Sequence, residues 1–151
     1  MSAVFRSRKT LSENVIIEKI MSQVGYKTIF AIATPPGRSA IAVIRISGPL
    51  AGDAPALFGA ACPSAGQFSV ARLVLDQRVI DQVMLLFMKA PFSSTGEDVC
   101  ESHCHGSRAV IDTLLARLGA EESFSMAKPG EFTRRSFMNG KMDLSGVEGL
   151  A

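Results

Sequence analysis

Residues 95–106 have the sequence TGEDVCESHCHG, in which Gly96 and Gly106 bracket one short strand. Successive side chains of a strand point to opposite faces of the sheet. One face of this strand therefore carries the ionisable residues Glu101, His103 and His105. The other face carries the small residues Cys100, Ser102 and Cys104. Because a carboxylate is rarely buried without a partner, we expect the Glu101 face to meet a ligand, a protein partner or solvent.

The sequence on both sides of this stretch predicts a small sheet with helices. Apolar, β-rich runs predict strands at residues 28–34, 41–47, 69–76, 79–89 and 124–127. Apolar residues at helical spacing and glycine stop signals predict helices at residues 50–59, 107–119 and 131–138. We expect a tight turn at Gln77-Arg78 to form a hairpin, whose second strand is long and strongly apolar and therefore central. This mixture of elements predicts an α+β fold with a mixed or mostly antiparallel sheet.

Length and composition indicate one globular domain. The 151 residues are 47% hydrophobic and 20% charged, and the formal charge of +2 is too small to indicate nucleic-acid binding by itself. No apolar run approaches the roughly 18 residues that a membrane span needs. Three cysteines do not form a disulfide framework, which favours a reducing compartment.

We divide the chain into three parts. Residues 1–27 form an amino-terminal extension that does not resemble a secretory signal. Three interpretations of it stay open: a mitochondrial leader, a disordered extension, or a true start of the protein at Met21. Residues 28–143 form the folded domain. Residues 144–151 begin a helix that has no stop signal, so we expect the chain to be a fragment of a longer protein.

Two cations outside the central stretch are candidates for binding a ligand. Arg45 interrupts an apolar strand, so its guanidinium needs an acceptor, either an internal carboxylate or a ligand anion. Lys141 follows the turn residue Gly140, where a side chain is easily presented to a ligand. We interpret its neighbours Arg134 and Arg135 as part of a solvated basic face.

Together, Arg45, Glu101 and Lys141 suggest a site for a pterin or a guanine. A carboxylate can accept two parallel hydrogen bonds from a planar N–H fork, which both ring systems present. Nearby cations would suit a ligand with an acidic tail. The phosphate loop of nucleotide hydrolases is absent, because Arg135 and Met142 stand where that pattern needs glycine and Ser or Thr.

A metal site at Glu101, His103 and His105 is a rival interpretation of this stretch, because these residues supply suitable nitrogen and oxygen ligands. Alternate residues of one strand lie about 6–7 Å apart, so the three converge poorly on one ion. A cysteine–histidine nucleophile is weaker still, since Cys104 points away from both histidines.

Three ordered motifs between residues 28 and 151 resemble the family of tRNA modification GTPases called MnmE or TrmE. They are ATPPGRSAIAVIRISGP at residues 33–49, TGEDVCESHCHG at residues 95–106 and KPGEFTRRSFMNGKMDL at residues 128–144. Two positions depart from the family pattern, which usually has an aromatic residue in place of Ser94 and often a second glycine in place of Ser107.

This resemblance implies a fold similar to the folate-binding aminomethyltransferase of the glycine cleavage system, the T-protein. It implies a homodimer that binds 5-formyl- or 5,10-methylene-tetrahydrofolate through Arg45, Glu101 and Lys141. In the family, a helical domain follows, with an inserted GTPase domain that binds GTP, magnesium and potassium. With the flavoprotein MnmG (GidA), the family modifies the wobble uridine of tRNA towards 5-carboxymethylaminomethyluridine, and tetrahydrofolate supplies the one-carbon unit.

For this chain, the resemblance implies a tetrahydrofolate-binding, dimer-forming domain, cytoplasmic, or mitochondrial in a eukaryote. Because the phosphate-loop GTPase domain is absent from this sequence, we expect neither GTP hydrolysis nor tRNA modification by the chain alone. No catalytic residue and no metal ligand is assigned. Two alternatives stay open: a dimerisation module that binds no ligand, and a domain that binds metal through Glu and His.

Overall fold

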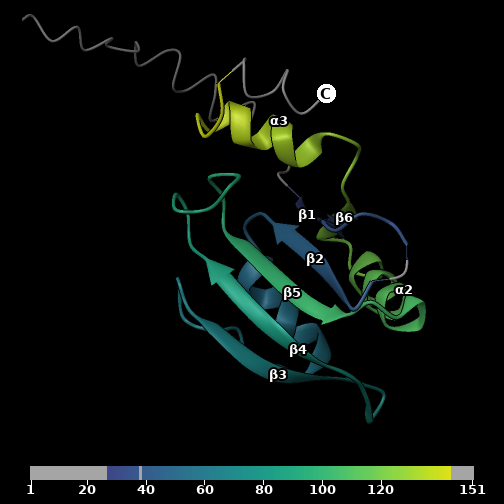
Figure 1. The fold of residues 1–151 in the computed structure, drawn as a ribbon. Coiled ribbons are helices and arrows are strands. Elements are labelled where there is room, and N and C mark those ends of the chain that lie inside the picture. The colour runs from purple at the N-terminus through teal and green to yellow at the C-terminus, as the bar shows by residue number, and fades with distance from the viewer. Residues whose placement is uncertain (1–26, 38, 144–151) are drawn as a thin grey trace, which may run out of the picture.

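The computed structural model describes residues 27–37 and 39–143. Over these residues the chain forms one six-stranded sheet with three helical segments, as Figure 1 shows. The strands are β1 (Thr28–Ile32), β2 (Ile41–Ser47), β3 (Phe68–Leu75), β4 (Arg78–Met88), β5 (Val99–His105) and β6 (Phe124–Met126). The helical segments are the 3₁₀ helix η1 (Ala51–Phe58) and the α-helices α2 (Arg108–Gly119) and α3 (Glu131–Met138).

The strands lie in the order β3-β4-β5-β2-β1-β6 across the sheet. All neighbouring pairs are antiparallel except β1 and β6, which are parallel. The predicted α+β fold with a mixed sheet is therefore confirmed, and so is the short strand that follows residue 123. The apolar hairpin strand predicted to be central, β4, lies inside the sheet and pairs with β3 and β5, while β5 and β2 occupy the two middle places.

The β3–β4 hairpin turns one residue earlier than predicted. Asp76 and Gln77 form the turn with φ of 49° and 62°, and two consecutive positive φ values are typical of a type I′ turn. A bulge between Leu73 and Val74 shifts the register just before the turn. Because a bulge places two residues opposite one, simple alternation along the sequence misplaces the turn.

One face of the sheet packs against η1 and α2 and forms the core, with η1 visible behind the strands in Figure 1. The core side chains alternate along the strands and include Phe30, Ala42, Ile44, Ile46, Val83, Leu85, Cys100 and Cys104. α2 adds Leu114 and Leu118, and η1 adds Ala51, Ala54 and Phe58. The predicted division of β5 into a small-residue face and an ionisable face is thereby confirmed.

The segment predicted as a helix at residues 50–59 is a 3₁₀ helix. Pro55 lies inside it and has no N–H to donate to a preceding turn, which disfavours a regular α-helix. Gly59 ends it with φ of 66°, in agreement with the predicted glycine stop.

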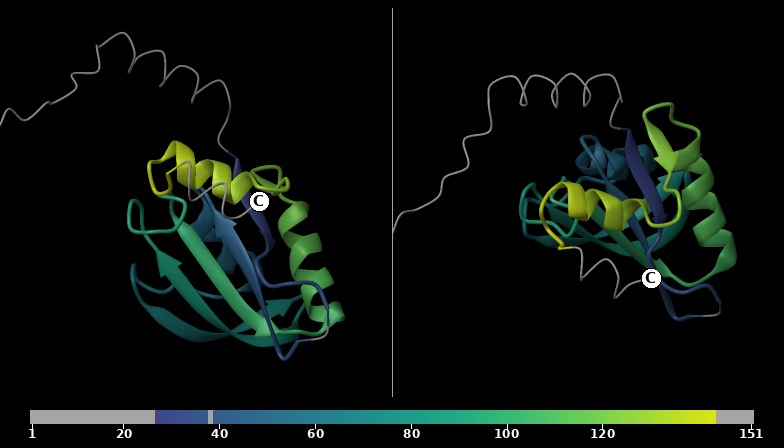
Figure 2. Two further views of the ribbon diagram at one scale, coloured as in Figure 1. Left: turned by 45° about the horizontal axis from the view of Figure 1, so that its top comes forward. Right: turned by 90° about the horizontal axis from the view of Figure 1, so that it is seen from above.

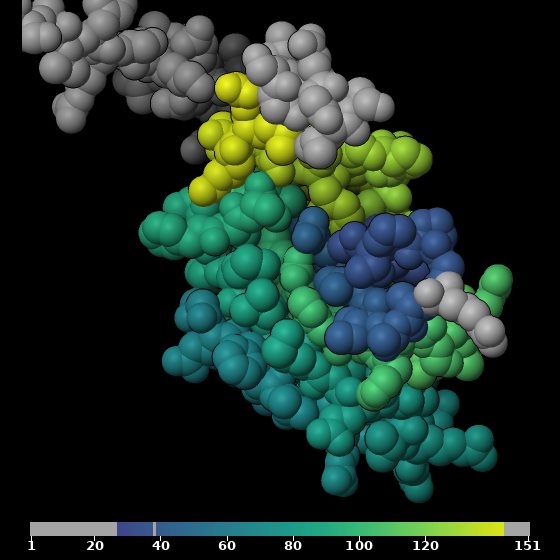
Figure 3. All heavy atoms as spheres, in the orientation of Figure 1, coloured from purple at the N-terminus to yellow at the C-terminus, as the bar shows by residue number. Residues whose placement is uncertain are grey.

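The opposite face of the sheet is called the open face here. Cross-strand partners share a face, so the register places these residues on it: Ile41, Val43, Arg45, Phe68, Val70, Met84, Leu86, Glu101 and His103. Figure 3 views the molecule from this side, with α3 in yellow above the strands. Seen from above in Figure 2, α3 crosses the end of the sheet. Within the described residues, α3 is the helix that approaches the open face.

None of the helices in the described ranges is long and apolar enough to cross a membrane. The predicted amino-terminal extension, Lys27 excepted, and the helix predicted to begin at residue 144 lie outside those ranges.

Candidate functional site

Arg45 and Glu101 lie directly opposite one another on β2 and β5. Arg45 Nε donates to Glu101 Oε1 at 2.8 Å. The side chain of Glu101 is 11% exposed and that of Arg45 is 32% exposed, so a nearly buried carboxylate lies beside an accessible guanidinium. The internal-carboxylate interpretation of Arg45 is confirmed, and the exposed part of the same side chain can still meet a ligand.

His103 is the second partner of Glu101. Its Nε2 lies 3.2 Å from Glu101 Oε2, on the same face of β5. A carboxylate has about four lone-pair positions on its two oxygens, so Arg45 and His103 leave room for two further donors. A planar N–H fork is a donor pair of this kind.

His105, by contrast, binds Asp81 of β4. The backbone N of His105 donates to Asp81 Oδ2 at 2.8 Å, and its Nδ1 lies 2.7 Å from Asp81 Oδ1. Burial alone would raise the pKa of Asp81, but hydrogen bonds from His105 and Gln82 outweigh it and lower the pKa overall. The proposed metal ligands do not converge, and in residues 27–37 and 39–143 no three His, Cys, Asp or Glu side chains could hold a metal ion.

α3 brings an aromatic ring to the ion pair. The guanidinium carbon of Arg45 lies 6.0 Å from the centroid of the Phe132 ring, within the range of a cation–π contact. Sequence reasoning missed Phe132, because no periodicity connects a residue of the last helix with the second strand. The ring gives the Arg45–Glu101 pair an apolar, planar neighbour.

Lys141 lies beside the loop that precedes β5. Gly96 in this loop has φ of 78°, and a Cβ added to it would lie 3.3 Å from Lys141 Cγ and 2.8 Å from Asn139 Cβ. The residue Lys141 is exposed, and in the described part of the chain the ion-pair partners of Glu101 are Arg45 and His103. The structure therefore brings Arg45 and Glu101 into contact and places Lys141 near the loop that leads to Glu101, without a direct contact.

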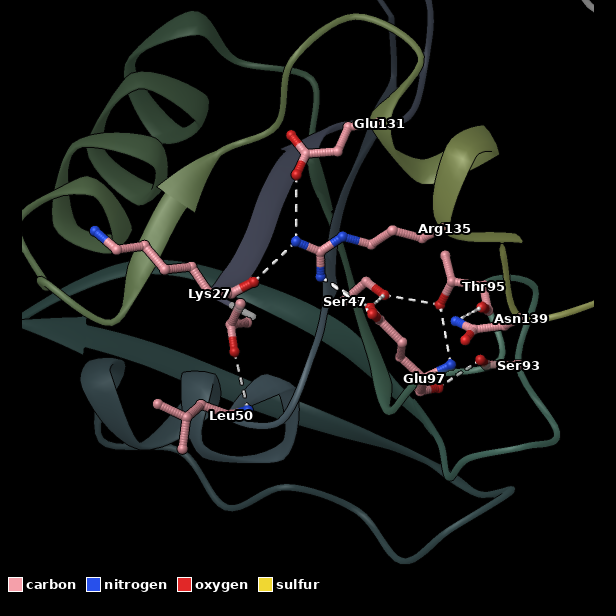
Figure 4. A network of polar contacts seen from close by, with 10 residues as sticks. Lys27, Ser47, Leu50, Ser93, Thr95, Glu97, Glu131, Arg135 and Asn139 are labelled. Atoms are coloured by element: carbon pink, nitrogen blue, oxygen red, sulfur yellow. Dashed lines mark hydrogen bonds and ion pairs between the residues drawn. The ribbon is translucent and has the colours of Figure 1, made fainter. Parts of the chain in front are cut away.

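A second polar cluster connects α3 with the same loop, as Figure 4 shows. Arg135 Nη1 donates to both carboxylate oxygens of Glu97, at 3.2 and 3.0 Å. Its Nη2 donates to the backbone oxygen of Lys27 at 3.0 Å and to Glu131 Oε1 at 3.2 Å. Arg135 is 7% exposed, so the prediction of a solvated basic face is wrong for this residue, while Arg134 is exposed as predicted.

The Glu97 carboxylate is also held from the sheet. Ser47 Oγ donates to Glu97 Oε2 at 2.7 Å, and Thr95 Oγ1 lies 2.7 Å from Ser47 Oγ. Since the Ser47 proton goes to the carboxylate, Thr95 donates to Ser47, and the backbone N of Glu97 donates to Thr95 at 3.3 Å. These bonds form a closed ring that fixes the orientation of the carboxylate.

The three cysteine thiols show no sign of activation. Burial raises the pKa of Cys100 to about 12 and also raises the pKa of Cys62 and of Cys104. Because a protonated thiol is a poor nucleophile, and Cys104 lies in the core, the cysteine–histidine alternative gains no support.

The sequence matches one protein family and is similar to several longer proteins. Residues 28–141 match the family described as GTP-binding protein TrmE N-terminus. The chain is 46% identical over 127 residues to the tRNA modification GTPase MnmE of Beijerinckia indica subsp. indica, covering 83% of this chain and 28% of that protein. It is 47% identical over 124 residues to the MnmE of Caulobacter vibrioides, covering 82% of this chain and 28% of that protein.

The MnmE of Rhodopseudomonas palustris strain BisB5 is 49% identical over 129 residues, covering 82% of this chain and 27% of that protein. The chain thus spans little more than a quarter of the length of these relatives. The family match runs from β1 to Lys141 and includes the Arg45–Glu101 pair and Arg135. The chain therefore belongs to the TrmE amino-terminal domain family, and the relatives named above that share this domain are tRNA modification GTPases MnmE.

Proposed function

We propose that this domain binds a reduced folate, 5-formyl- or 5,10-methylene-tetrahydrofolate, at Arg45 and Glu101. The observation that carries the proposal is the nearly buried Glu101 carboxylate, oriented by Arg45 and His103 on the open face. Fixed in this way, it can accept a ring N–H and the adjacent exocyclic amine of a pterin. The planar Phe132 ring lies beside the pair, and Lys141 is the candidate partner of the acidic tail. Membership of the family supports this assignment.

Isothermal titration with 5-formyltetrahydrofolate tests the proposal. We expect one saturable site per subunit in the wild-type chain. Glu101→Gln keeps the shape of the side chain but removes its charge, and should weaken binding by about 1.5–3 kcal/mol, or tenfold and more. Glu121→Gln, which removes a half-exposed carboxylate paired with Arg117, is the matched control and should bind like wild type. Equal affinity of Glu101→Gln and wild type would contradict the assignment.

We further infer that the domain forms a homodimer through the open face. Four apolar residues are exposed there: Ile41, Phe68, Val70 and Met84. Apolar residues gathered on one face are typical of protein contact sites. The competing function is a dimerisation module that binds no folate, and a stable dimer that gives no heat on titration would favour it.

For an MnmE protein that contains this domain, we propose a role in modifying the wobble uridine of tRNA in the cytoplasm, with MnmG as the partner and the folate as the source of the one-carbon unit. GTP would bind outside this domain. The printed name of the relatives, tRNA modification GTPase, supports this role. We also propose that the sheet is arranged as in the folate-binding aminomethyltransferase of the glycine cleavage system.

A further inference from the structure

We propose that Arg135 and Glu97 are positioning residues for the ligand site, because their ion pair fixes α3 against the strands that carry Arg45 and Glu101. The inference rests on the proposed folate function and extends it. Neither residue needs to touch the ligand. Both act through α3, which carries Phe132 and leads directly to Lys141.

α3 is attached to the domain in a different way from α2. α2 buries Leu114 and Leu118, whereas the two buried residues of α3 are polar, Arg135 and Ser136. The apolar residues at the end of α3, Phe137 and Met138, are 46% and 57% exposed. Among the residues that the structure describes, the hydrophobic effect therefore contributes little to the placement of α3, which depends on polar contacts.

Three polar contacts connect α3 and the residue after it with the loop at residues 94–97, and we call them the α3 anchor. Arg135 donates to Glu97, Ser136 Oγ donates to the backbone oxygen of Ser94 at 2.7 Å, and Asn139 Nδ2 donates to the backbone oxygen of Thr95 at 2.7 Å. The first is the charged contact, with side chains 8% and 13% exposed. Because the guanidinium donates to both oxygens of this carboxylate, and hydrogen bonds between charged groups are the stronger ones, this contact should dominate the anchor.

On the helix side, the anchor holds two parts of the proposed site. Phe132 lies one turn before Arg135 and contacts the Arg45 guanidinium. The backbone N of Lys141 donates to the backbone oxygen of Ser136 at 2.8 Å, so Lys141 is placed by the same helix. A displaced α3 would move the aromatic ring and the cation together.

On the sheet side, the anchor ends close to Arg45 and Glu101, the other two parts of the proposed site. Ser47, which donates to Glu97, is two residues after Arg45 on β2. Glu97 itself leads into β5, where Glu101 is the third residue. The Arg135–Glu97 pair therefore joins the two halves of the site, and cutting it should separate Lys141 and Phe132 from Arg45 and Glu101 without altering the latter pair.

A cycle of variants separates a positioning role from a general loss of stability. Glu97→Gln cuts the charged contact between loop and helix. Glu131→Gln is the matched control, because it removes a carboxylate from the same guanidinium but lies within α3 and leaves the contact to the loop. Glu97→Gln and Glu131→Gln are each made as single variants, as double variants with Lys141→Ala and as double variants with Glu101→Gln. All of these proteins are titrated with 5-formyltetrahydrofolate.

In the wild-type background, we expect Lys141→Ala to weaken binding about tenfold, as for one hydrogen bond to a charged group. In the Glu97→Gln background, binding should be weaker at the outset, and Lys141→Ala should cost less than about twofold more. Glu101→Gln should keep its effect there. In the Glu131→Gln background both effects should persist. An undiminished Lys141→Ala effect in Glu97→Gln, or equal behaviour of Glu131→Gln and Glu97→Gln, would overturn the inference.

Amide hydrogen exchange without ligand gives an independent test. Glu97→Gln should speed exchange in residues 131–141 while β2 and β5 stay protected. Equal exchange in the wild type and in Glu97→Gln overturns the inference, whether or not folate binds. If the wild type binds no folate, the proposed function is wrong, and the ligand-positioning role fails with it even if Glu97→Gln speeds exchange. If Glu97→Gln does not fold, Glu97→Asp, which keeps the charge but shortens the side chain by one methylene and so weakens the contact to Arg135, replaces it in both tests.

Discussion

A carboxylate in the middle of a sheet is destabilising unless cations and donors surround it. Glu101 meets this condition through Arg45 on the neighbouring strand and His103 on its own strand. The same two partners fix both carboxylate oxygens before any ligand arrives. A group oriented in advance loses less conformational freedom on binding, which favours tight association.

Asp81 gives the fold a pH dependence at the residue scale. Its pKa is lowered in the folded chain, so ionised Asp81 stabilises the fold above the unfolded value of about 3.9, and this contribution is lost as the pH falls through the lowered folded value. We expect Asp81→Asn to lower the free energy of unfolding by about 1 kcal/mol at neutral pH and by less in acid. Urea denaturation at about pH 7 and pH 2.5 measures both values.

Asp112→Asn is the control for this prediction, because Asp112 forms an exposed ion pair with Arg108 and should matter little at either pH. An Asp81→Asn effect of the same size at both pH values would show that the lowered pKa has no energetic consequence.

The sequence predicted the environment of some site residues but not of others. Arg45 and Glu101 interrupt strands in which charge is unexpected, and each therefore indicated a need for a partner. Arg135 lies in a basic run that is typical of a solvated helix face, and its main acceptor, Glu97, is 38 positions away. Ion pairing over such a separation leaves no trace in local spacing, so the burial of Arg135 could not be predicted.

At the scale of elements, the β3–β4 turn carries a residue that is poorly suited to it. Gln77 has φ of 62°, a conformation that glycine adopts without the steric cost of a Cβ. We expect Gln77→Gly to raise the free energy of unfolding by about 0.5–1 kcal/mol, measured by urea denaturation.

Gln67→Gly makes the same chemical change at an exposed position before β3 that does not have positive φ. It should be neutral or destabilising, because there glycine only increases the freedom of the unfolded chain. If both variants change stability alike, the positive φ at Gln77 is not the cause.

The limits of β2 and α3 agree with the prediction, because strong local signals mark them: a β-branched run for β2 and an Asn-Gly stop after α3. The order of strands could not be predicted in this way. It depends on long-range pairing, and the polar β5 takes a central place because β2 supplies the cation that its carboxylate needs.

At the scale of the whole molecule, the open face should decide the oligomeric state. Val70 is 65% exposed on this face. We expect Val70→Glu to raise the dimer dissociation constant 30-fold or more, about 2 kcal/mol, because a dimer would have to bury an unpaired charge. Sedimentation equilibrium measures the change.

Met126→Glu, at a residue that is 54% exposed on β6 and whose pairing with Phe30 places it on the core side of the sheet, introduces the same charge outside the open face and should leave the dimer unchanged. A Val70→Glu chain that remains as dimeric as wild type would place the contact elsewhere.

The sequence predicted the fold class and three motif segments, but not that these segments meet. The structure places β2 and β5 side by side in the middle of the sheet, and the α3 anchor holds α3 against the loop that leads into β5. This arrangement depends on contacts between residues far apart in the chain, which periodicity does not report.

The pairing of β1 also determines what happens while the chain is being synthesised. β1 pairs with β2, which follows it closely, and with β6, whose three residues come after α2. A ribosome releases the β1–β2 hairpin long before it releases Met126. Until then β1 lacks the strand that covers its second edge in the folded sheet, so we expect this edge to be open to pairing with other chains during synthesis.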